Sequence, residues 1–339
     1  MSIEEFLQKR SKCPVIDVRS PSEYKQGHIP GAVNIPLFQD EERAIVGTLY
    51  KQRGKYEAVK AGLDLLGPKL SAILRRSRRV IGNSEALIYC WRGGLRSESI
   101  AWLLNLSAIK CQVLKDGYKA YRRFHHTIFL TSYQLMVLGG PTGSGKTEVL
   151  HQIKMKGHQV IDLEDLANHK GSVFGGIGNS SQPTTEQFQN NLFEAFYALD
   201  RKKPIWVENE NQVIGNVVLP EIFYEKIINS PLIQLQVSKN TRIRRLVNDY
   251  GLLNKEEITK AISKIEKRLG NLNMKTAINA LEKGDLIQTA DILLTYYDKA
   301  YHQSFDQKRH NCICTIKTEE AKPDILAEKI FQNIKEGAF

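Results

Sequence analysis

A cysteine stands where an apolar run gives way to a glycine-rich turn. Residues 89–97 read YCWRGGLRS, and Cys90 ends the apolar run Ala86–Tyr89 ahead of an expected helix. Turn amides and the N-terminus of a helix favour an anionic sulfur, as do the neighbouring Arg92 and Arg96. We therefore expect Cys90 to work as a nucleophile or to carry a persulfide or perselenide. A buried, unreactive cysteine of the sheet is the alternative.

A second glycine-rich segment, residues 140–147 (GPTGSGKT), is a complete phosphate-binding motif between an expected strand and an expected helix. Its glycines let backbone amides converge on phosphate oxygens, and the helix N-terminus adds partial positive charge. Lys146 is expected to reach a terminal phosphate, and Thr147 is a possible magnesium ligand. The predicted phosphate-binding residues are Gly140, Gly143, Ser144, Gly145, Lys146 and Thr147. The motif predicts a bound diphosphate or triphosphate and leaves open whether it belongs to a nucleotide.

Two acidic residues follow a later apolar run, in residues 206–211 (WVENEN). Glu208 stands where nucleotide hydrolases usually carry Asp, which argues against ordinary ATP hydrolysis. Glu208 and Glu210 are possible supporting residues of the phosphate site, with plain surface acids as the alternative.

The net charge of +11 is concentrated at the front of the chain: +10 in residues 1–125, −3 in 126–235 and +4 in 236–339. Such an excess favours a polyanionic partner, with nucleic acid as the first candidate. Two basic stretches are candidate contacts, the second with rings between its cations. Their residues are Arg75, Arg76, Arg78 and Arg79, then Lys119, Tyr121, Arg122 and Arg123. Arg242, Arg244 and Arg245 are further candidates for phosphate contacts. A solvated helix face or an interdomain linker is the alternative for the two stretches, and an exposed helix face is the alternative for the last three arginines.

The composition, 42% hydrophobic and 25% charged over 339 residues, is that of a globular chain with two or three packed units. No apolar run approaches the ~20 residues that span a bilayer, and residues 1–8 do not resemble a signal peptide. We expect a cytoplasmic protein with no membrane partner. Five cysteines in so long a chain predict no disulfide framework.

Short apolar runs alternate with helical spacing, which predicts an α/β chain with mostly parallel sheets. The expected strands are 14–18, 32–35, 86–89, 112–114, 134–138, 160–163, 205–207 and 232–237. Expected helices include 56–74, 97–106 and one that ends at Gly157. Beyond residue 240 the pattern predicts long helices and one late strand at 312–316.

Residues 17–20 (DVRS) and 27–32 (GHIPGA), with the Cys90 turn, resemble the rhodanese domain; Arg19 is a possible supporting residue. Joined to a phosphate-binding loop, and with residues 34–37 (NIPL) and 50–52 (YKQ), nearly the whole chain resembles the tRNA 2-selenouridine synthase family. The resemblance implies a rhodanese-like α/β domain at 1–125 and a P-loop parallel-sheet α/β domain at 130–238. A mainly helical C-terminal region, 239–339, would pack on the P-loop domain.

The resemblance also implies a two-step reaction on one tRNA. Wobble 2-thiouridine, in Lys, Glu and Gln tRNAs, would be alkylated on sulfur by geranyl diphosphate, and selenium from selenophosphate would then replace the geranylthio group. Lys146 would stabilise the diphosphate leaving group, and Cys90, Arg92 and Arg96 would serve the selenium step. Both donors are substrates, so no tightly bound cofactor is expected; nor is an obligate protein partner. The donor requires an apolar groove beside the phosphate loop.

Two other functions fit the same motifs. In an ATP-dependent tRNA sulfurtransferase, the loop would activate the substrate with ATP and a Cys90 persulfide would deliver sulfur. In a nucleotide-gated RNA-binding module, Cys90 would be only a redox sensor. The turn flanked by Arg92 and Arg96 argues against the sensor, and Glu208 argues against the use of ATP.

Overall fold

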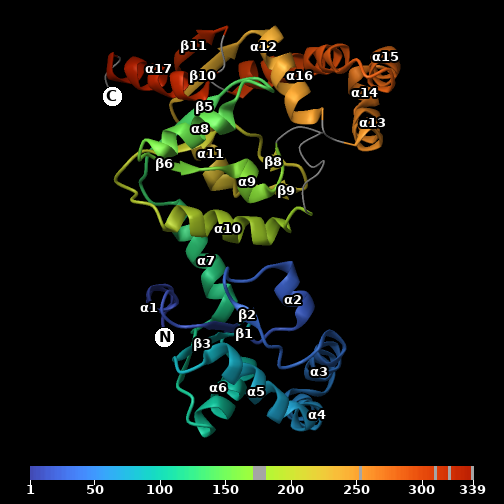
Figure 1. Cartoon of the computed structure of the whole chain (residues 1–339). Coiled ribbons are helices and arrows are strands. Elements are labelled where there is room, and N and C mark those ends of the chain that lie inside the picture. The colour runs from blue at the N-terminus through green and yellow to red at the C-terminus, as the bar shows by residue number, and fades with distance from the viewer. Residues whose placement is uncertain (171–180, 252–253, 309–310, 320–321, 337–339) are drawn as a thin grey trace. The chain divides into compact units, whose positions relative to one another are not determined.

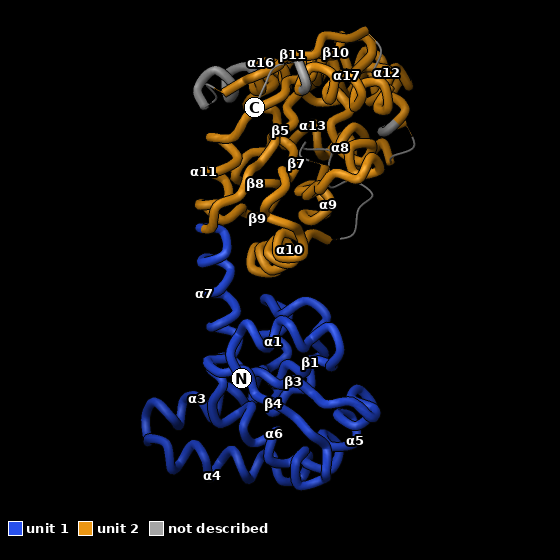
Figure 2. The backbone as a smooth tube through the Cα atoms, turned by 90° about the vertical axis from the view of Figure 1, so that its left-hand side faces the viewer, with its two compact units in different colours: residues 1–130 blue, residues 131–339 orange. Residues whose placement is uncertain are grey.

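A computed structural model describes the chain except residues 171–180, 252–253, 309–310, 320–321 and 337–339. The described residues form two compact units, residues 1–130 and 131–339, which Figure 2 shows in blue and orange. The boundary falls between Leu130 and Thr131, and residues 131–339 fold as one unit.

Unit 1 is built on a parallel sheet with the strand order β2-β1-β3-β4. The strands are β1 (Val15–Asp17), β2 (Val33–Asn34), β3 (Ala86–Tyr89) and β4 (Cys111–Val113). All four residues of β3 are buried, as its continuous apolar run predicts for a central strand.

Seven α-helices are described in unit 1. They are α1 (Ile3–Lys9), α2 (Pro21–Gln26), α3 (Asp40–Arg53), α4 (Lys55–Leu66), α5 (Leu70–Ile81), α6 (Leu95–Leu106) and α7 (Gly117–Phe129). α3 and α4 are joined at Gly54 and pack side by side (Figure 1). The single helix expected at 56–74 is wrong. A 3-10 turn, Gly67–Lys69, separates α4 from α5 because Pro68 has no N–H to donate.

Unit 2 contains a five-stranded parallel sheet with the order β11-β10-β5-β7-β6. Its strands are β5 (Leu135–Gly139), β6 (Gln159–Ile161), β7 (Ile205–Glu208), β10 (Leu232–Val237) and β11 (Cys312–Thr318). A small antiparallel ribbon pairs β8 (Val213–Ile214) with β9 (Val217–Val218). The predicted α/β class with parallel sheets is confirmed.

Helices cover the sheet of unit 2 and extend from it (Figure 1). They are α8 (Lys146–Met155), α9 (Leu163–Ala167), α10 (Thr185–Tyr197), α11 (Glu221–Asn229), α12 (Lys239–Tyr250), α13 (Lys255–Lys264), α14 (Glu266–Leu269), α15 (Asn271–Glu282), α16 (Leu286–Lys308) and α17 (Pro323–Glu336). No helix in the described part of the chain is both long and apolar enough to cross a membrane.

The last part of the chain completes the sheet of unit 2. β11 pairs in parallel with β10 as the edge strand, and α17 packs against α8. Ile316 of β11 and Leu326 and Ile330 of α17 share a buried core with Val149 and Ile153 of α8. The late strand is therefore an integral part of the phosphate-loop sheet.

Candidate functional site

Cys90 directly follows β3 and is 3% exposed. Its Sγ lies 3.2 Å from Oγ of Ser97 and 3.9 Å from the carbonyl oxygen of Gly94, to which Ser97 also donates a hydrogen bond. The thiol therefore lies against the first turn of α6. At that end of a helix the backbone dipole favours an anionic sulfur.

The turn after Cys90 depends on a close backbone approach from the start of α7. Gly93 has φ +64°, and a Cβ there would lie 2.4 Å from the carbonyl oxygen of Leu114. A Cβ on Gly117 would lie 2.2 Å from the carbonyl oxygen of Cys90, which accepts a hydrogen bond from the amide of Tyr118. Both positions therefore require glycine.

The two arginines of the turn differ in their contacts. Arg96 forms an ion pair with Glu23, with Nη1 2.6 Å from Oε2. Burial raises the pKa of Glu23, but Arg96, the amide of Ser20 and Arg43 together lower it more, so the pKa falls. Arg92 is exposed and lines one groove together with Cys90. Arg92 is thus the better placed of the two to meet an incoming anion.

Arg19 lies inside unit 1 and is fully buried. It pairs with Asp17 at 2.6 Å, and its guanidinium lies 4.0 Å from the ring centre of Tyr118 and 5.9 Å from that of Trp91. Burial lowers its pKa, but Asp17 and, to a lesser extent, Tyr89 and Tyr118 together raise it more, so Arg19 stays charged. Arg19 contacts the Cys90 turn through the ring of Trp91, and because it is buried it is not accessible to a substrate.

The phosphate-binding loop follows β5, the middle strand of the sheet. Gly143 and Gly145 have φ of +78° and +84°, and a Cβ on Gly140 would lie 2.5 Å from Oγ of Ser144. Nζ of Lys146 donates to the carbonyl oxygen of Gly140 at 3.1 Å. The predicted loop residues are thus brought together around the N-terminus of α8.

Two buried polar atoms near this loop find no hydrogen-bond partner among the described residues: Oγ of Ser144 and Oε2 of Glu208. The other oxygen of Glu208 accepts from the amide of Glu164 at 2.8 Å, and Glu164 accepts from the hydroxyl of Thr147 at 3.0 Å. Buried polar groups are normally satisfied, so these atoms indicate a site for a polar ligand.

Glu164, Glu208 and Glu210 lie around Lys146, and the four groups change one another's pKa values. Burial raises the pKa of Glu208 well above its ordinary value, and the neighbouring carboxylates add to this. Burial and Glu164 raise the pKa of Glu210 to about 7. Burial lowers the pKa of Lys146, but Glu210, Glu164 and the other acidic groups around it together raise it more, so the lysine stays charged. The site therefore holds a cation beside carboxyl groups whose pKa values are raised, and that of Glu210 lies at about 7.

Arginines of α12 lie against the loop from the other side. Arg242 is buried, forms two hydrogen bonds of 2.7 Å with Asp298 and donates to the carbonyl oxygen of Thr142. A Cβ on Gly145 would lie 3.0 Å from the guanidinium of Arg245, which pairs with Glu148 at 2.6 Å. Arg242 holds the loop in place, and Arg245 adds positive charge next to the amide of Gly145.

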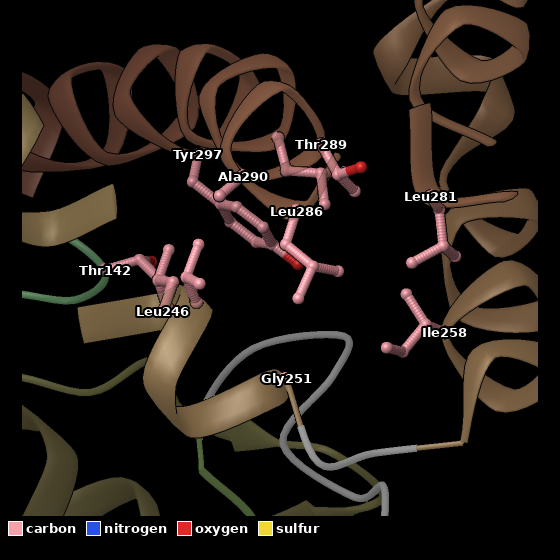
Figure 3. A pocket seen from close by; sticks show the side chains of 11 residues that line it. Thr142, Leu246, Gly251, Ile258, Leu281, Leu286, Thr289, Ala290 and Tyr297 are labelled. Atoms are coloured by element: carbon pink, nitrogen blue, oxygen red, sulfur yellow. The ribbon is translucent and has the colours of Figure 1, made fainter. Parts of the chain in front are cut away.

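An apolar cavity borders the loop at Thr142 (Figure 3). Its walls come from α12, α13, α15 and α16, and Figure 3 shows Leu246, Leu286 and Tyr297 pointing into it. The cavity measures about 40 Å³. An apolar space beside the phosphate loop was expected for a geranyl donor; one is present, and it is small.

The residues predicted to contact nucleic acid differ in their exposure to solvent. The four arginines of α5, Arg75, Arg76, Arg78 and Arg79, are all exposed, as are Lys119 and Arg123 on α7; Arg122 is partly exposed. Tyr121 is fully buried between Tyr118 and His125, so the prediction that it contacts nucleic acid is wrong. The alternation of rings and cations reflects a helix with one face in the core.

The structure adds residues that sequence reasoning did not select. Glu164 lies in the segment after β6 and contacts Thr147, and Ser97 contacts the thiol of Cys90. The hydroxyl of Tyr301, on α16, would lie 3.4 Å from a Cβ on Gly139 and donates to Gln234. Ser97 is part of the Cys90 segment, residues 89–97, and could have been selected from it. Nothing in the sequence around Tyr301 indicates that it lies near the phosphate loop.

Among the described residues no cluster of three His, Cys, Asp or Glu is arranged to hold a metal on its own. Thr147, Glu164 and the free oxygen of Glu208 nevertheless fit the partial ligand set that Mg²⁺ uses when substrate phosphates supply the rest.

Two sheets, each with a glycine-rich turn after a central strand, define a rhodanese-like domain followed by a P-loop domain. A family model for the rhodanese-like domain matches residues 2–124, and one for the tRNA 2-selenouridine synthase AAA domain matches residues 133–330. The chain belongs to the tRNA 2-selenouridine synthase family of enzymes, as its relatives also indicate.

One tRNA 2-selenouridine synthase, from Bdellovibrio bacteriovorus, is 34% identical over 87% of this chain and 89% of its own length. Another, from Nitrosomonas europaea, is 39% identical over 70% of this chain, a match that spans 64% of that protein. A crystal structure, the N-terminal domain of a putative ATP/GTP binding protein from Clostridium difficile, is 42% identical; it covers 37% of this chain and 96% of its own, with a TM-score of 0.34.

Proposed function

We propose that this protein replaces the sulfur of wobble 2-thiouridine in tRNA by selenium in two steps. Unit 2 transfers a geranyl group from geranyl diphosphate to the sulfur, and unit 1 exchanges the geranylthio group for selenium from selenophosphate. Membership of the tRNA 2-selenouridine synthase family supports the overall reaction. The two glycine-rich turns support its division between the units.

In the first step the sulfur attacks C1 of the geranyl group, the C1–O bond breaks and diphosphate leaves. The base gives up its N3 proton, which keeps the alkylated product neutral. Negative charge grows on the leaving oxygen, so fixed donors at that position lower the barrier. Lys146, the amides around Gly143 and Gly145, and Arg245 supply them.

A carboxylate near Lys146 takes up the proton. Glu210, with its pKa raised to about 7, is matched to this task at neutral pH. Thr147, Glu164 and Glu208 would hold Mg²⁺ together with the diphosphate. The metal would neutralise charge on the leaving group.

The apolar cavity at Thr142 is the observation that carries the choice of donor. A nucleotide needs polar partners for its base, whereas an isoprenoid chain needs only apolar walls. The cavity presents Leu246, Leu286 and Tyr297 next to the phosphate loop (Figure 3). At about 40 Å³ it must widen to take the chain, by movement of such side chains.

In the second step the thiolate of Cys90 bonds to C2 of the base, the C2–S bond breaks, and the departing sulfur takes a proton to leave as geranylthiol. The selenium of selenophosphate then bonds to C2 while the bond from C2 to Sγ of Cys90 breaks and the thiol is restored. Water finally cleaves the P–Se bond to give phosphate and 2-selenouridine. We assign Cys90 to this step because its sulfur lies at the N-terminus of α6 beside the exposed Arg92.

Mass spectrometry of nucleosides tests the proposal. A tRNA that contains 2-thiouridine is incubated with the protein and geranyl diphosphate, and then with selenophosphate, without ATP throughout. The geranylated base and then the selenated base are expected in turn. A tRNA that changes only when ATP and a sulfur donor are supplied would identify an ATP-dependent sulfurtransferase instead.

A further inference from the structure

Unit 1 contains a large groove that opens beside Cys90. It measures about 970 Å³, which lies within the range of about 300–1,000 Å³ for pockets that enclose small ligands. One wall is the pair of helices α3 and α4, and the other is the turn after Cys90 with the start of α6. The two-step scheme above assigns no ligand to this groove.

The surface of the groove is mostly apolar and much of it faces solvent. Large apolar side chains that line it are exposed by 58% at Tyr50, 40% at Val59, 64% at Leu63, 36% at Trp91 and 51% at Leu95. Single exposed apolar side chains are ordinary, but five around one hollow form a patch of the kind that binds an apolar partner.

Cations stand at the edge of the same groove. Arg43, Lys51, Arg92 and Arg96 line it, and among the described lining residues Glu23 is the one carboxylate. Glu23 is committed to Arg96 at 2.6 Å and lies 3.9 Å from Arg43. Lys51 and Arg92, both exposed, leave a positive edge beside an apolar floor. The groove thus suits an apolar chain attached to an anionic body.

We propose that this groove binds the isoprenoid chain of an S-alkylated base in tRNA, with its C2–S bond directed towards Cys90. This assignment rests on the proposed function, in which the alkylated base is the substrate of the second step. The chain is apolar and the nucleotide that carries it is flanked by phosphates, which match the floor and the edge of the groove. The cavity at Thr142 would then hold the chain before transfer and this groove after it.

A matched pair of variants tests the assignment. Leu63→Asp places a charge in the groove, whereas Leu106→Asp places it at a 70% exposed position on α6 that does not line the groove. The probes are two anticodon stem-loop RNAs, one with S-geranyl-2-thiouridine and one with S-methyl-2-thiouridine. The measurement is the Kd of each RNA for each full-length protein.

The native protein and Leu106→Asp should bind the geranyl RNA at least about tenfold more tightly than the methyl RNA, because several buried methylenes contribute. Leu63→Asp should lose this preference and keep its affinity for the methyl RNA. An equal preference in both variants would overturn the assignment. So would a dimer of the native protein that Leu63→Asp dissociates, since a second copy would then cover the groove.

A second variant guards against misfolding. Ala44→Trp fills the groove from the exposed side of α3 without adding charge, and it should abolish the same preference. Different results would contradict the assignment of the groove and the proposed reaction. If the native protein prefers the geranyl RNA but never forms 2-selenouridine, the reaction is wrong and the groove stands. If it forms 2-selenouridine while both groove variants keep the preference, the groove is wrong and the reaction stands.

Discussion

The two units place a glycine-rich turn at the same point of the fold, between a central parallel strand and the helix that follows. In unit 1 the turn carries its own reactive atom, the thiol of Cys90, and Gly93 of the turn packs closely against the backbone of Leu114 and Gly117. In unit 2 the turn offers amides and Lys146, while the carboxylates come from neighbouring strands and loops. One architecture thus supports either a nucleophile or a binding site for a leaving group, depending on whether a cysteine precedes the turn or a lysine follows it.

Loss of Lys146, the cation of the unit 2 turn, should have the largest effect. It should also show that the two turns serve different steps of the reaction. Lys146→Ala should slow geranylation by at least about 10²-fold, because the departing diphosphate loses its main charge partner. Selenation of tRNA that is already geranylated should continue. Single-turnover assays of each step measure this, and an equal loss of both steps would show that the units do not divide the chemistry.

The converse change acts on unit 1. Cys90→Ser should leave geranylation unchanged and slow selenation by about 10²-fold or more, because a hydroxyl is a far weaker nucleophile than a thiolate. Cys13→Ser, a change of another free cysteine of unit 1, is the control and should leave both steps intact. Failure of geranylation in a folded Cys90→Ser protein would contradict the comparison.

The units also differ in charge, since residues 1–125 carry +10. Replacement of Arg75, Arg76, Arg78 and Arg79 by Glu should weaken tRNA binding by about tenfold or more. It should also lower the slope of log K against log salt by about 0.7–0.9 for each phosphate that the protein no longer neutralises. Binding titrations at several salt concentrations measure this. An unchanged slope would leave α5 as a solvated helix face.

The smallest effect concerns proton uptake in unit 2. The pKa of Glu210 is raised from 4.5 to about 7, so between these values the folded chain holds a proton that the unfolded chain releases. Stability from this group is therefore present at low pH and lost as the pH rises through 7. Between pH 5 and pH 8 the thermal midpoint of the native protein should fall by about 5–10 °C more than that of Glu210→Gln.

Circular dichroism at the two pH values measures these midpoints. Glu221→Gln, at an exposed position on α11, is the control and should behave as the native protein does. If Glu210→Gln shows the same pH dependence as the native protein, Glu210 ionises normally and is not the base that accepts the N3 proton.

Strands and turns were the predictable part of this molecule. β3 and β10 have the expected bounds, because continuous apolar runs are recognisable without tertiary context. α3 was not expected, since its sequence is rich in charge and buries none of its residues. The groove between α3, α4 and the Cys90 turn therefore could not be anticipated.

Side-chain placement was predictable only where the backbone motif dictates it. Lys146 and Thr147 lie where the phosphate-loop motif puts them, whereas Glu164 reaches Thr147 from the separate helix α9. Tyr121 is a case in which local sequence misleads. Its basic neighbours indicate an exposed ring, but its position in the helical repeat places the ring on the buried face of the helix. Pairing across the sheet, and the rotation of a helix about its axis, are tertiary properties that local composition does not encode.

The pairing of β11 with β10 has a consequence for biosynthesis. Unit 1 needs only residues 1–130, so all its strands have been made before most of unit 2 exists. Unit 2 must wait for residues 312–336, because β11 covers the edge of β10 and α17 covers α8. Until then the nascent chain exposes an unpaired strand edge and apolar helix surface, the features that recruit chaperones or lead to aggregation. A chain truncated after Val237 should therefore yield a folded unit 1 attached to an insoluble unit 2.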